Sequence, residues 1–209
     1  LSLPRLISLG TLDEFSAATM LDGLDRGDPL LIFGRTGVGK TTLSNAILAS
    51  LPRHWRIVSV EEVREVEDLT RYGMHHTPYE VTTSKLDFVR FLLHRNPDLV
   101  FLGEVLGREH AEALDLTAFS GLKVLATTHA RDFQGLVMKW SSWGLSLPER
   151  TLTVKMEDKR VAEMRYWVDG SWYEPPTPSS RWLSYVRWLE GAETNEDVSR
   201  RIKELPSQS

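Results

Sequence analysis

Residues 30–42 read LLIFGRTGVGKTT, and they hold the strongest structural signal in this chain of 209 residues. Four apolar residues run directly into a glycine, which is typical of a short buried strand followed by a tight turn. Apolar side chains then recur at helical spacing from Leu43 to Leu51, so a helix is predicted to follow. The stretch therefore predicts a strand, a glycine-rich loop and a helix, in that order.

The loop at residues 34–41 fits the full phosphate-binding pattern G-x-x-x-x-G-K-[ST]. Its glycines let the backbone aim N–H groups at phosphate oxygens, and the amino end of the helix adds a favourable dipole. Lys40 is predicted to bridge the β- and γ-phosphates of a nucleotide, and Thr41 to hold Mg²⁺ through its hydroxyl. The predicted nucleotide-binding residues are Gly34, Thr36, Gly37, Val38, Gly39, Lys40, Thr41 and Thr42.

Strand and helix patterns alternate through the following hundred or so residues. Strands are predicted at residues 55–60, 99–102 and 124–127, and helices at 84–94, 108–119 and 133–143. Strands that alternate with helices indicate an α/β fold with a mainly parallel sheet, covered on both faces.

After Pro148 the pattern changes to alternation at period two. It predicts an antiparallel meander of three strands, at residues 151–156, 160–168 and 171–173. A proline-rich linker precedes a helical stretch at 181–189 and a last helix that begins at Thr194 and carries Val198, Ile202 and Leu205. We therefore expect a core at 1–148, an antiparallel β extension at 149–175 and a helical tail at 176–209.

Composition narrows the classes of partner. The chain has 25 basic and 29 acidic residues and no cysteine. This balance argues against nucleic acid or an anionic membrane as the main partner, and the missing cysteines exclude disulfides and thiolate metal sites. No apolar run is long enough to span a bilayer, and no secretory signal opens the sequence. We expect a soluble, cytoplasmic protein.

Polar residues follow three of the predicted strands. Glu104 ends a buried apolar strand, Glu61 follows an earlier strand and His129 a later one. The carboxyl ends of parallel strands meet at one edge of the sheet, where ligands bind. A carboxylate there can hold the Mg²⁺ shell and orient or deprotonate an attacking water, so Glu104 is the leading catalytic candidate.

Four ordered motifs resemble those of the hexameric secretion ATPases of type II and type IV secretion, type IV pilus and archaellum machines. Residues 34–42 resemble the Walker A motif of that family, and IVSVEE at 57–62 its Asp box. RNPDLVFLGE at 95–104 is similar to its Walker B motif, and GLKVLATTHA at 121–130 to its His box. The resemblance covers roughly residues 5–170, and the joint order of the motifs is far more specific than any one of them.

The resemblance implies a RecA-like P-loop core that hydrolyses ATP with Mg²⁺ in a homo-oligomeric, hexameric ring, peripheral to a membrane-embedded machine. It implies that Glu61 helps to position the lytic water, that Glu104 serves Mg²⁺ and hydrolysis, and that His129 senses the γ-phosphate. The sequence departs from the family at Glu62, Val63 and Leu106, where Asp, Pro and Arg are common. The usual amino-terminal domain has no counterpart here, so we expect a minimal member or a fragment.

Other functions stay open at this stage. A nucleotide-binding regulator without useful turnover fits Leu106 and the missing domain. A small P-loop kinase is disfavoured because Glu61 and Glu104 suit an attacking water better than an acceptor pocket. A nucleic-acid translocase is disfavoured by the acidic balance. A GTP switch is disfavoured because no Asn-Lys-x-Asp sequence is present. No arginine is assigned as the finger that stabilises the transition state.

Overall fold

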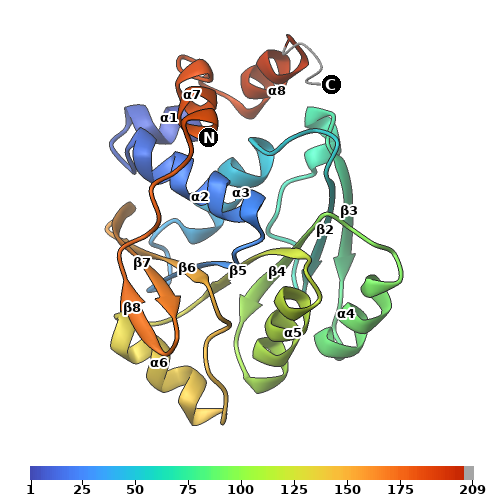
Figure 1. The fold of residues 1–209 in the computed structure, drawn as a ribbon. Coiled ribbons are helices and arrows are strands. Elements are labelled where there is room, and N and C mark those ends of the chain that lie inside the picture. Colours follow the sequence, from blue (N-terminus) through green and yellow to red (C-terminus); the bar gives the residue numbers. More distant parts are fainter. Residues whose placement is uncertain (205–209) are drawn as a thin grey trace.

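A single mixed sheet organises the computed structural model, which describes residues 1–204 (Figure 1). Its eight strands in this part of the chain lie in the order β3-β2-β4-β5-β1-β6-β7-β8. The strands are β1 (Leu30–Gly34), β2 (Arg56–Glu61), β3 (His75–Glu80), β4 (Leu99–Val105), β5 (Lys123–Thr128), β6 (Thr151–Glu157), β7 (Arg160–Val168) and β8 (Ser171–Tyr173). Neighbouring strands pair in parallel across the sheet from β3 through β2, β4, β5 and β1 to β6. The pairs β6–β7 and β7–β8 are antiparallel. The expected α/β fold with a mainly parallel sheet is confirmed.

Helices cover both faces of the sheet, as Figure 1 shows. One face carries α1 (Leu3–Ser8), α2 (Glu14–Arg26), α3 (Lys40–Ala49) and α7 (Ser180–Trp188). The other carries α4 (Lys85–Leu93), α5 (Arg108–Phe119) and α6 (Phe133–Ser142). A short 3₁₀ helix, η1 (Leu69–Tyr72), and α8 (Asn195–Glu204) lie beside the end of α3.

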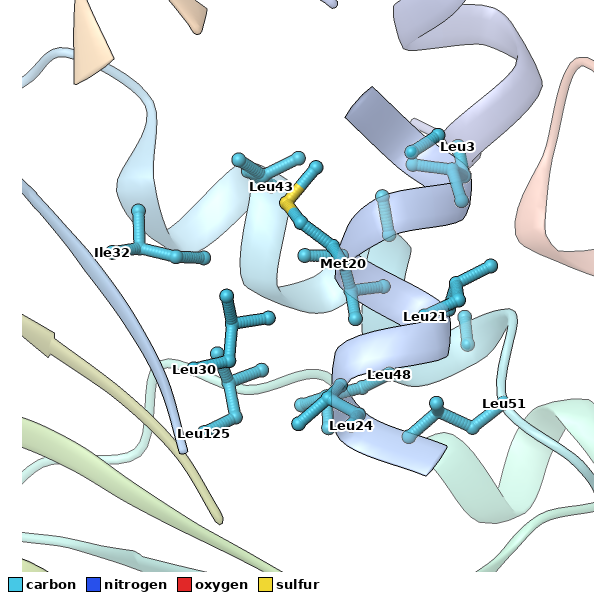
Figure 2. Packing of buried hydrophobic residues seen from close by; sticks show 14 of the residues in the cluster. Leu3, Met20, Leu21, Leu24, Leu30, Ile32, Leu43, Leu48, Leu51 and Leu125 are labelled. Carbon is cyan, nitrogen blue, oxygen red and sulfur yellow. The ribbon is translucent and has the colours of Figure 1, made fainter. Parts of the chain in front are cut away.

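The central strand β1 shows why the sequence folds into layers. All four of its apolar side chains are fully buried, with Leu30 and Ile32 in the cluster under α2 and α3. Leu31 and Phe33 point to the opposite cluster, under α5 and α6. Each such side chain contributes roughly 1.5–3 kcal/mol on burial. Figure 2 shows the first cluster, where α2 and α3 side chains meet those of the sheet.

The meander differs in one respect from its expected form. Strand β6 pairs antiparallel with β7, as predicted, but its other edge pairs in parallel with β1. Residues 151–154 are therefore all buried instead of alternating in exposure. The antiparallel strands extend the core sheet and share its hydrophobic clusters.

Several elements were not predicted from the sequence. No element was expected before residue 30, where α1 and α2 lie, and β3 was missed because it contains Pro78. Proline is compatible with β3 because that strand forms an edge of the sheet. The predicted tail helices are present, and Thr194 and Asp197 cap α8 reciprocally, each side chain accepting from the other's backbone N–H. Leu205, predicted to belong to this helix, lies outside the described residues.

Candidate phosphate-binding site

The glycine-rich loop joins β1 to α3 in a conformation that two glycines make possible. A Cβ at Gly34 would collide with the carbonyl oxygen of Met156, so β6 packs directly against the start of the loop. Gly39 has φ +96° and is the N-cap of α3, with no side chain to cap the helix. The first N–H groups of α3 are therefore left for a ligand, as in an anion-binding helix terminus.

Lys40 is folded back onto the loop that it follows. Its Nζ donates to the carbonyl oxygens of Gly34, at 3.2 Å, and Arg35, at 3.1 Å. The residue is only 7% exposed, and this burial lowers the pKa of the ammonium, against the opposing charges of Glu104 and Glu65. The lysine is thus held at the loop by acceptors that phosphate oxygens can replace.

His129 connects Lys40 to Glu104. Lys40 Nζ lies 3.1 Å from His129 Nδ1, and His129 Nε2 lies 2.5 Å from Glu104 Oε1. A neutral imidazole protonated on Nε2 satisfies these two contacts, because Nδ1 then accepts from the ammonium and Nε2–H donates to the carboxylate. The carbonyl oxygen of Gly34, 3.2 Å from Nδ1, would instead accept from a protonated Nδ1. The imidazole and the carboxylate keep about a third of their surface exposed, 38% and 33%. The result is a polar chain from the loop to the end of β4 that solvent can reach.

Thr41, the first residue after Lys40, contacts a carboxylate that sequence reasoning did not single out. Its Oγ1 donates to Glu65 Oε2 at 2.7 Å. Asn45, one turn further along α3, donates to the carbonyl oxygens of Thr41 and Glu65 and accepts from the N–H of Glu67. Asn45 thereby connects the loop that follows β2 to helix α3 by hydrogen bonds.

Glu61, the last residue of β2, turns its buried carboxylate into that same loop. Glu61 is 3% exposed. Its Oε1 accepts hydrogen bonds from the N–H of Glu65 at 3.0 Å and the N–H of Val66 at 3.1 Å. Burial raises the pKa of the Glu61 carboxyl, while the two backbone donors oppose the change. In this conformation Glu61 organises the loop that presents Glu65 to Thr41.

Gly103 makes the close approach of β2 and β4 possible. It has φ +63°, and a Cβ there would come within 3.2 Å of both Glu61 Cγ and the carbonyl oxygen of Val60. The glycine before Glu104 therefore serves the packing of Glu61 as well as the direction of Glu104.

A cleft of about 880 Å³ opens beside the loop. Its lining includes Arg35, Thr36 and Val38 of the loop, His129 and Arg131 after β5, and Lys155 of β6. The volume lies in the usual range for small-molecule sites. Its three cations, Arg35, Arg131 and Lys155, outnumber the two acids of the lining, Glu157 and Asp158, so the cleft suits an anionic ligand such as a nucleotide.

Binding of Mg²⁺ at this site would need ligands from phosphate and water in addition to protein oxygens. Within residues 1–204 no group of three or more His, Asp or Glu side chains is arranged to hold a metal ion. Mg²⁺ commonly takes one or two protein oxygens and completes its shell with phosphates and water. The Thr41 hydroxyl beside the Glu65 carboxylate, with Glu104 partly exposed nearby, fits that mode.

The structure brings most of the predicted site residues to one edge of the sheet. Lys40, His129 and Glu104 are in contact, whereas Glu61 lies on the neighbouring strand with its carboxylate turned into its own loop. The roles assigned to these residues stay predictions. Sequence reasoning missed Glu65 and Asn45, and only the position of Glu65 four residues after Glu61 hinted at a second acid.

Comparison with known proteins relates this arrangement to a family. The family model described as "Type II/IV secretion system protein" matches residues 3–154. The competence protein ComGA of Bacillus subtilis is 30% identical over 144 residues, which are 66% of this chain and 40% of ComGA. The uncharacterized protein MJ1287 of Methanocaldococcus jannaschii is 27% identical over 152 residues, 69% of this chain and 55% of that protein.

Among solved structures, the ATPase DotB of Legionella pneumophila superposes with a TM-score of 0.60 at 19% identity. The match covers 100% of this chain and 58% of DotB, and identity this low shows the fold alone. The chain thus spans 40% to 58% of the length of these three proteins. In the described part of the chain, no helix combines the length and apolarity that crossing a membrane requires.

Proposed function

Because the chain belongs to the family of type II/IV secretion system proteins, we propose that it is the ATP-hydrolysing core of a motor that powers a secretion, pilus or archaellum-type machine. The observation that carries this proposal is the contact chain from Lys40 through His129 to Glu104. It joins a complete phosphate-binding loop to a carboxylate that is suited to activate water.

In this proposal the protein first binds the triphosphate. The backbone N–H groups of residues 36–42 cradle the phosphates at the start of α3, and Lys40 exchanges its carbonyl and imidazole acceptors for β- and γ-phosphate oxygens. Thr41 and Glu104 would hold Mg²⁺, which when bound would supply positive charge against the charge that develops on the phosphates during transfer. Release of Lys40 from His129 Nδ1 leaves the imidazole beside the γ-phosphate, able to respond to its presence or loss.

Hydrolysis then uses the carboxylate at the end of β4. Glu104 orients a water for attack on the γ-phosphorus and accepts its proton as the bond to the β-phosphate oxygen breaks, which releases ADP and phosphate. His129 holds the carboxylate by its Nε2 contact. Glu61 helps to position this water through the loop that follows β2, because its buried carboxylate holds the backbone of Glu65, whose side chain contacts Thr41.

The proposed assembly is a homo-oligomer, with a hexameric ring as the specific form. Under this proposal the ring works in the cytoplasm at the periphery of a membrane-embedded machine. Light scattering coupled to size exclusion, with and without Mg²⁺ and a non-hydrolysable ATP analogue, tests the number of subunits. A chain that stays monomeric at every concentration in the presence of nucleotide contradicts autonomous ring formation.

The first test of function is Mg²⁺-dependent ATP hydrolysis over a range of protein concentrations. Glu104→Gln removes the proposed base and is expected to lower turnover by at least about a hundredfold. Glu174→Gln, an exposed carboxylate after the edge strand β8, is the matched control and should leave turnover unchanged. Turnover that survives in Glu104→Gln would remove this carboxylate from the mechanism.

A nucleotide-binding regulator is the second candidate function. It is favoured by Leu106, which is 49% exposed directly after β4 and cannot supply positive charge there. This candidate predicts tight ATP binding with no turnover at any protein concentration. Turnover that rises with assembly and is lost in Glu104→Gln excludes it in favour of the motor.

A further inference from the structure

The end of strand β4 loses one of its two neighbouring strands, β2, while Glu104 and Val105 stay paired with Thr127 and Thr128 of β5. Its pairing with β2 extends only to Phe101, opposite Ser59. On the other side, the register with β5 shifts between Phe101 and Glu104. Buried carbonyl groups need donors, so residues 102–105, which carry Glu104, need donors on the β2 side that the ladder with β2 does not supply beyond Phe101.

Lys85 supplies donors on the β2 side. It is the first residue of α4 and is only 2% exposed. Its Nζ lies 3.1 Å from the carbonyl oxygen of Glu104 and 3.5 Å from that of Leu102. Glu62 Oε1 lies 3.9 Å from the same ammonium. One buried lysine thus takes the place of the missing strand for two carbonyl groups of β4.

Lys139 of α6 supplies donors on the β5 side. Its Nζ lies 2.9 Å from Thr128 Oγ1, 3.0 Å from the carbonyl oxygen of His129 and 3.4 Å from that of Val105. Thr128 Oγ1 in turn donates to the same carbonyl of Val105 at 2.7 Å. This lysine therefore fixes the backbone of Val105 relative to that of His129, the residue that contacts Glu104.

A buried ammonium group at either position costs free energy unless acceptors or opposite charges compensate it. Burial lowers the pKa of each ammonium. In Lys85 the charges of Glu62 and Glu109, and to a lesser degree those of Glu61 and Glu104, oppose this change. In Lys139 the charge of Glu104 opposes it. Lys85 also sits at the amino end of a helix, where the dipole disfavours a cation. An apolar side chain would avoid these costs, but it would remove the Lys85 donor from the carbonyl groups of Leu102 and Glu104 and leave that of Val105 with Thr128 Oγ1 as its side-chain donor.

We propose that Lys85 and Lys139 are positioning residues, which fix the backbone on either side of Glu104 and so direct its carboxylate toward His129 and Mg²⁺. This inference rests on the proposed function of the site. In the described structure the amine contacts of both lysines with β4 are to backbone carbonyl groups. The two residues act through Glu104, and neither is placed against the phosphates.

The test measures how strongly Mg²⁺ improves binding of the non-hydrolysable analogue AMP-PNP, as the ratio of its Kd in EDTA to its Kd in Mg²⁺, by calorimetry. Measurement of this ratio does not require ATP hydrolysis. Glu104→Gln should lower it, and Lys85→Met and Lys139→Met should each lower it by about tenfold, as loss of a supporting residue typically does. The Kd in EDTA should stay within about threefold of the wild type. Lys203→Met, an exposed lysine on α8, should leave the ratio unchanged.

The decisive comparison is in the Glu104→Gln background. Residues that act through Glu104 should lower the ratio no further there, because the coupled substitutions are not additive. The inference is overturned if either lysine substitution lowers the ratio in the Glu104→Gln background by the same factor as in the wild-type background. It is also overturned if Lys85→Met and Lys139→Met have the wild-type ratio. Both outcomes leave the proposed function intact.

Other outcomes test the proposed function instead. A normal ratio in Glu104→Gln removes Glu104 from metal binding, and absence of AMP-PNP binding in the wild-type chain overturns the proposed function itself. Both outcomes overturn the inference as well. Melting temperatures of all variants identify any that fail to fold. Lys139, which is half-buried, keeps the inference testable if replacement of the fully buried Lys85 is not tolerated.

Discussion

Gly103 is the residue whose backbone sets the direction of Glu104. Gly103→Ala would place a methyl group 3.2 Å from Glu61 Cγ at φ +63°, a conformation that costs a non-glycine residue about 1–2 kcal/mol. We expect a loss of that size in the free energy of unfolding, together with a fall in ATP turnover as Glu61 and Glu104 move. Chemical denaturation and steady-state hydrolysis measure the two effects.

Gly107 provides the matched control for this substitution. It has extended backbone geometry, with φ −153°, and open space where a Cβ would lie. Gly107 is also the N-cap of α5, where alanine is less favourable than glycine, so Gly107→Ala is expected to cost no more than about 1 kcal/mol in the free energy of unfolding. Equal losses in the two variants would show that the positive φ and the close approach of Glu61 are not the cause.

His76 makes stability depend on pH. It is 7% exposed and contacts Ser59 Oγ at 3.0 Å, and burial lowers its pKa to about 4. The unfolded chain takes up the proton near 6.5, so stabilisation that is complete above pH 6.5 is lost as pH falls toward 4. The loss should reach about 3 kcal/mol over this interval, measured by urea unfolding at a series of pH values.

The neighbouring His75 separates this effect from general acid denaturation. It is exposed, so His75→Gln should retain the pH dependence of the wild type. His76→Gln should be less stable at pH 7.5 but lose less stability on acidification. If both variants follow the wild-type curve, groups other than His76 cause the pH dependence.

The sequence predicted those site residues that lie in a contiguous motif or directly at the end of an apolar strand. The phosphate loop is a contiguous motif, and Glu104 and His129 each end an apolar strand, so their convergence could be predicted from parallel pairing alone. Lys85, Lys139 and Glu65 could not be predicted in this way. Their contacts depend on how helices and loops pack over the end of β4, and in sequence they resemble ordinary surface charges.

Helix α4 depends on its cap to place Lys85. Ser84 Oγ accepts from the N–H of Asp87 at 3.1 Å and donates to Glu109 Oε1 at 2.8 Å. Ser84→Ala is expected to cost about 1 kcal/mol in the free energy of unfolding. Ser141→Ala, an exposed position in α6, should cost nothing measurable. A neutral effect of Ser84→Ala in denaturant unfolding contradicts the capping role.

The elements that were predicted and those that were missed differ in physical character. Helix α5 has the predicted bounds, 108–119, because its apolar positions recur regularly and a glycine precedes it. Strand β3 has no such signal, since its residues are mostly polar and an edge position tolerates Pro78. In β6 the period-two pattern predicted a strand but not its parallel partner, because pairing with β1 is a contact between distant parts of the chain.

The carboxyl-terminal helices bear on the organisation of the whole molecule. The proline-rich linker predicts a helical tail at residues 176–209 after the core and its β extension. In the structure, Trp182 and Val186 of α7 belong to the main hydrophobic cluster. Tyr185 donates to the carbonyl oxygen of Ser50 at the end of α3, at 2.8 Å. These contacts favour one cooperative unit that includes α7.

Trp182→Ala tests whether the chain unfolds as one unit. The indole is 3% exposed, and its Nε1 donates to Asp25 Oδ2 at 3.1 Å, so its loss should cost about 3–5 kcal/mol. If α7 shares the core, calorimetry should show one transition, lowered by roughly 6–20 °C. Ser184→Ala, exposed on the same helix, should melt like the wild type. A separate early transition, with the melting of the sheet unchanged, would instead mean that residues 176–209 fold apart from the core. In that case the contacts of α7 with α2 and α3 would not stabilise the nucleotide site.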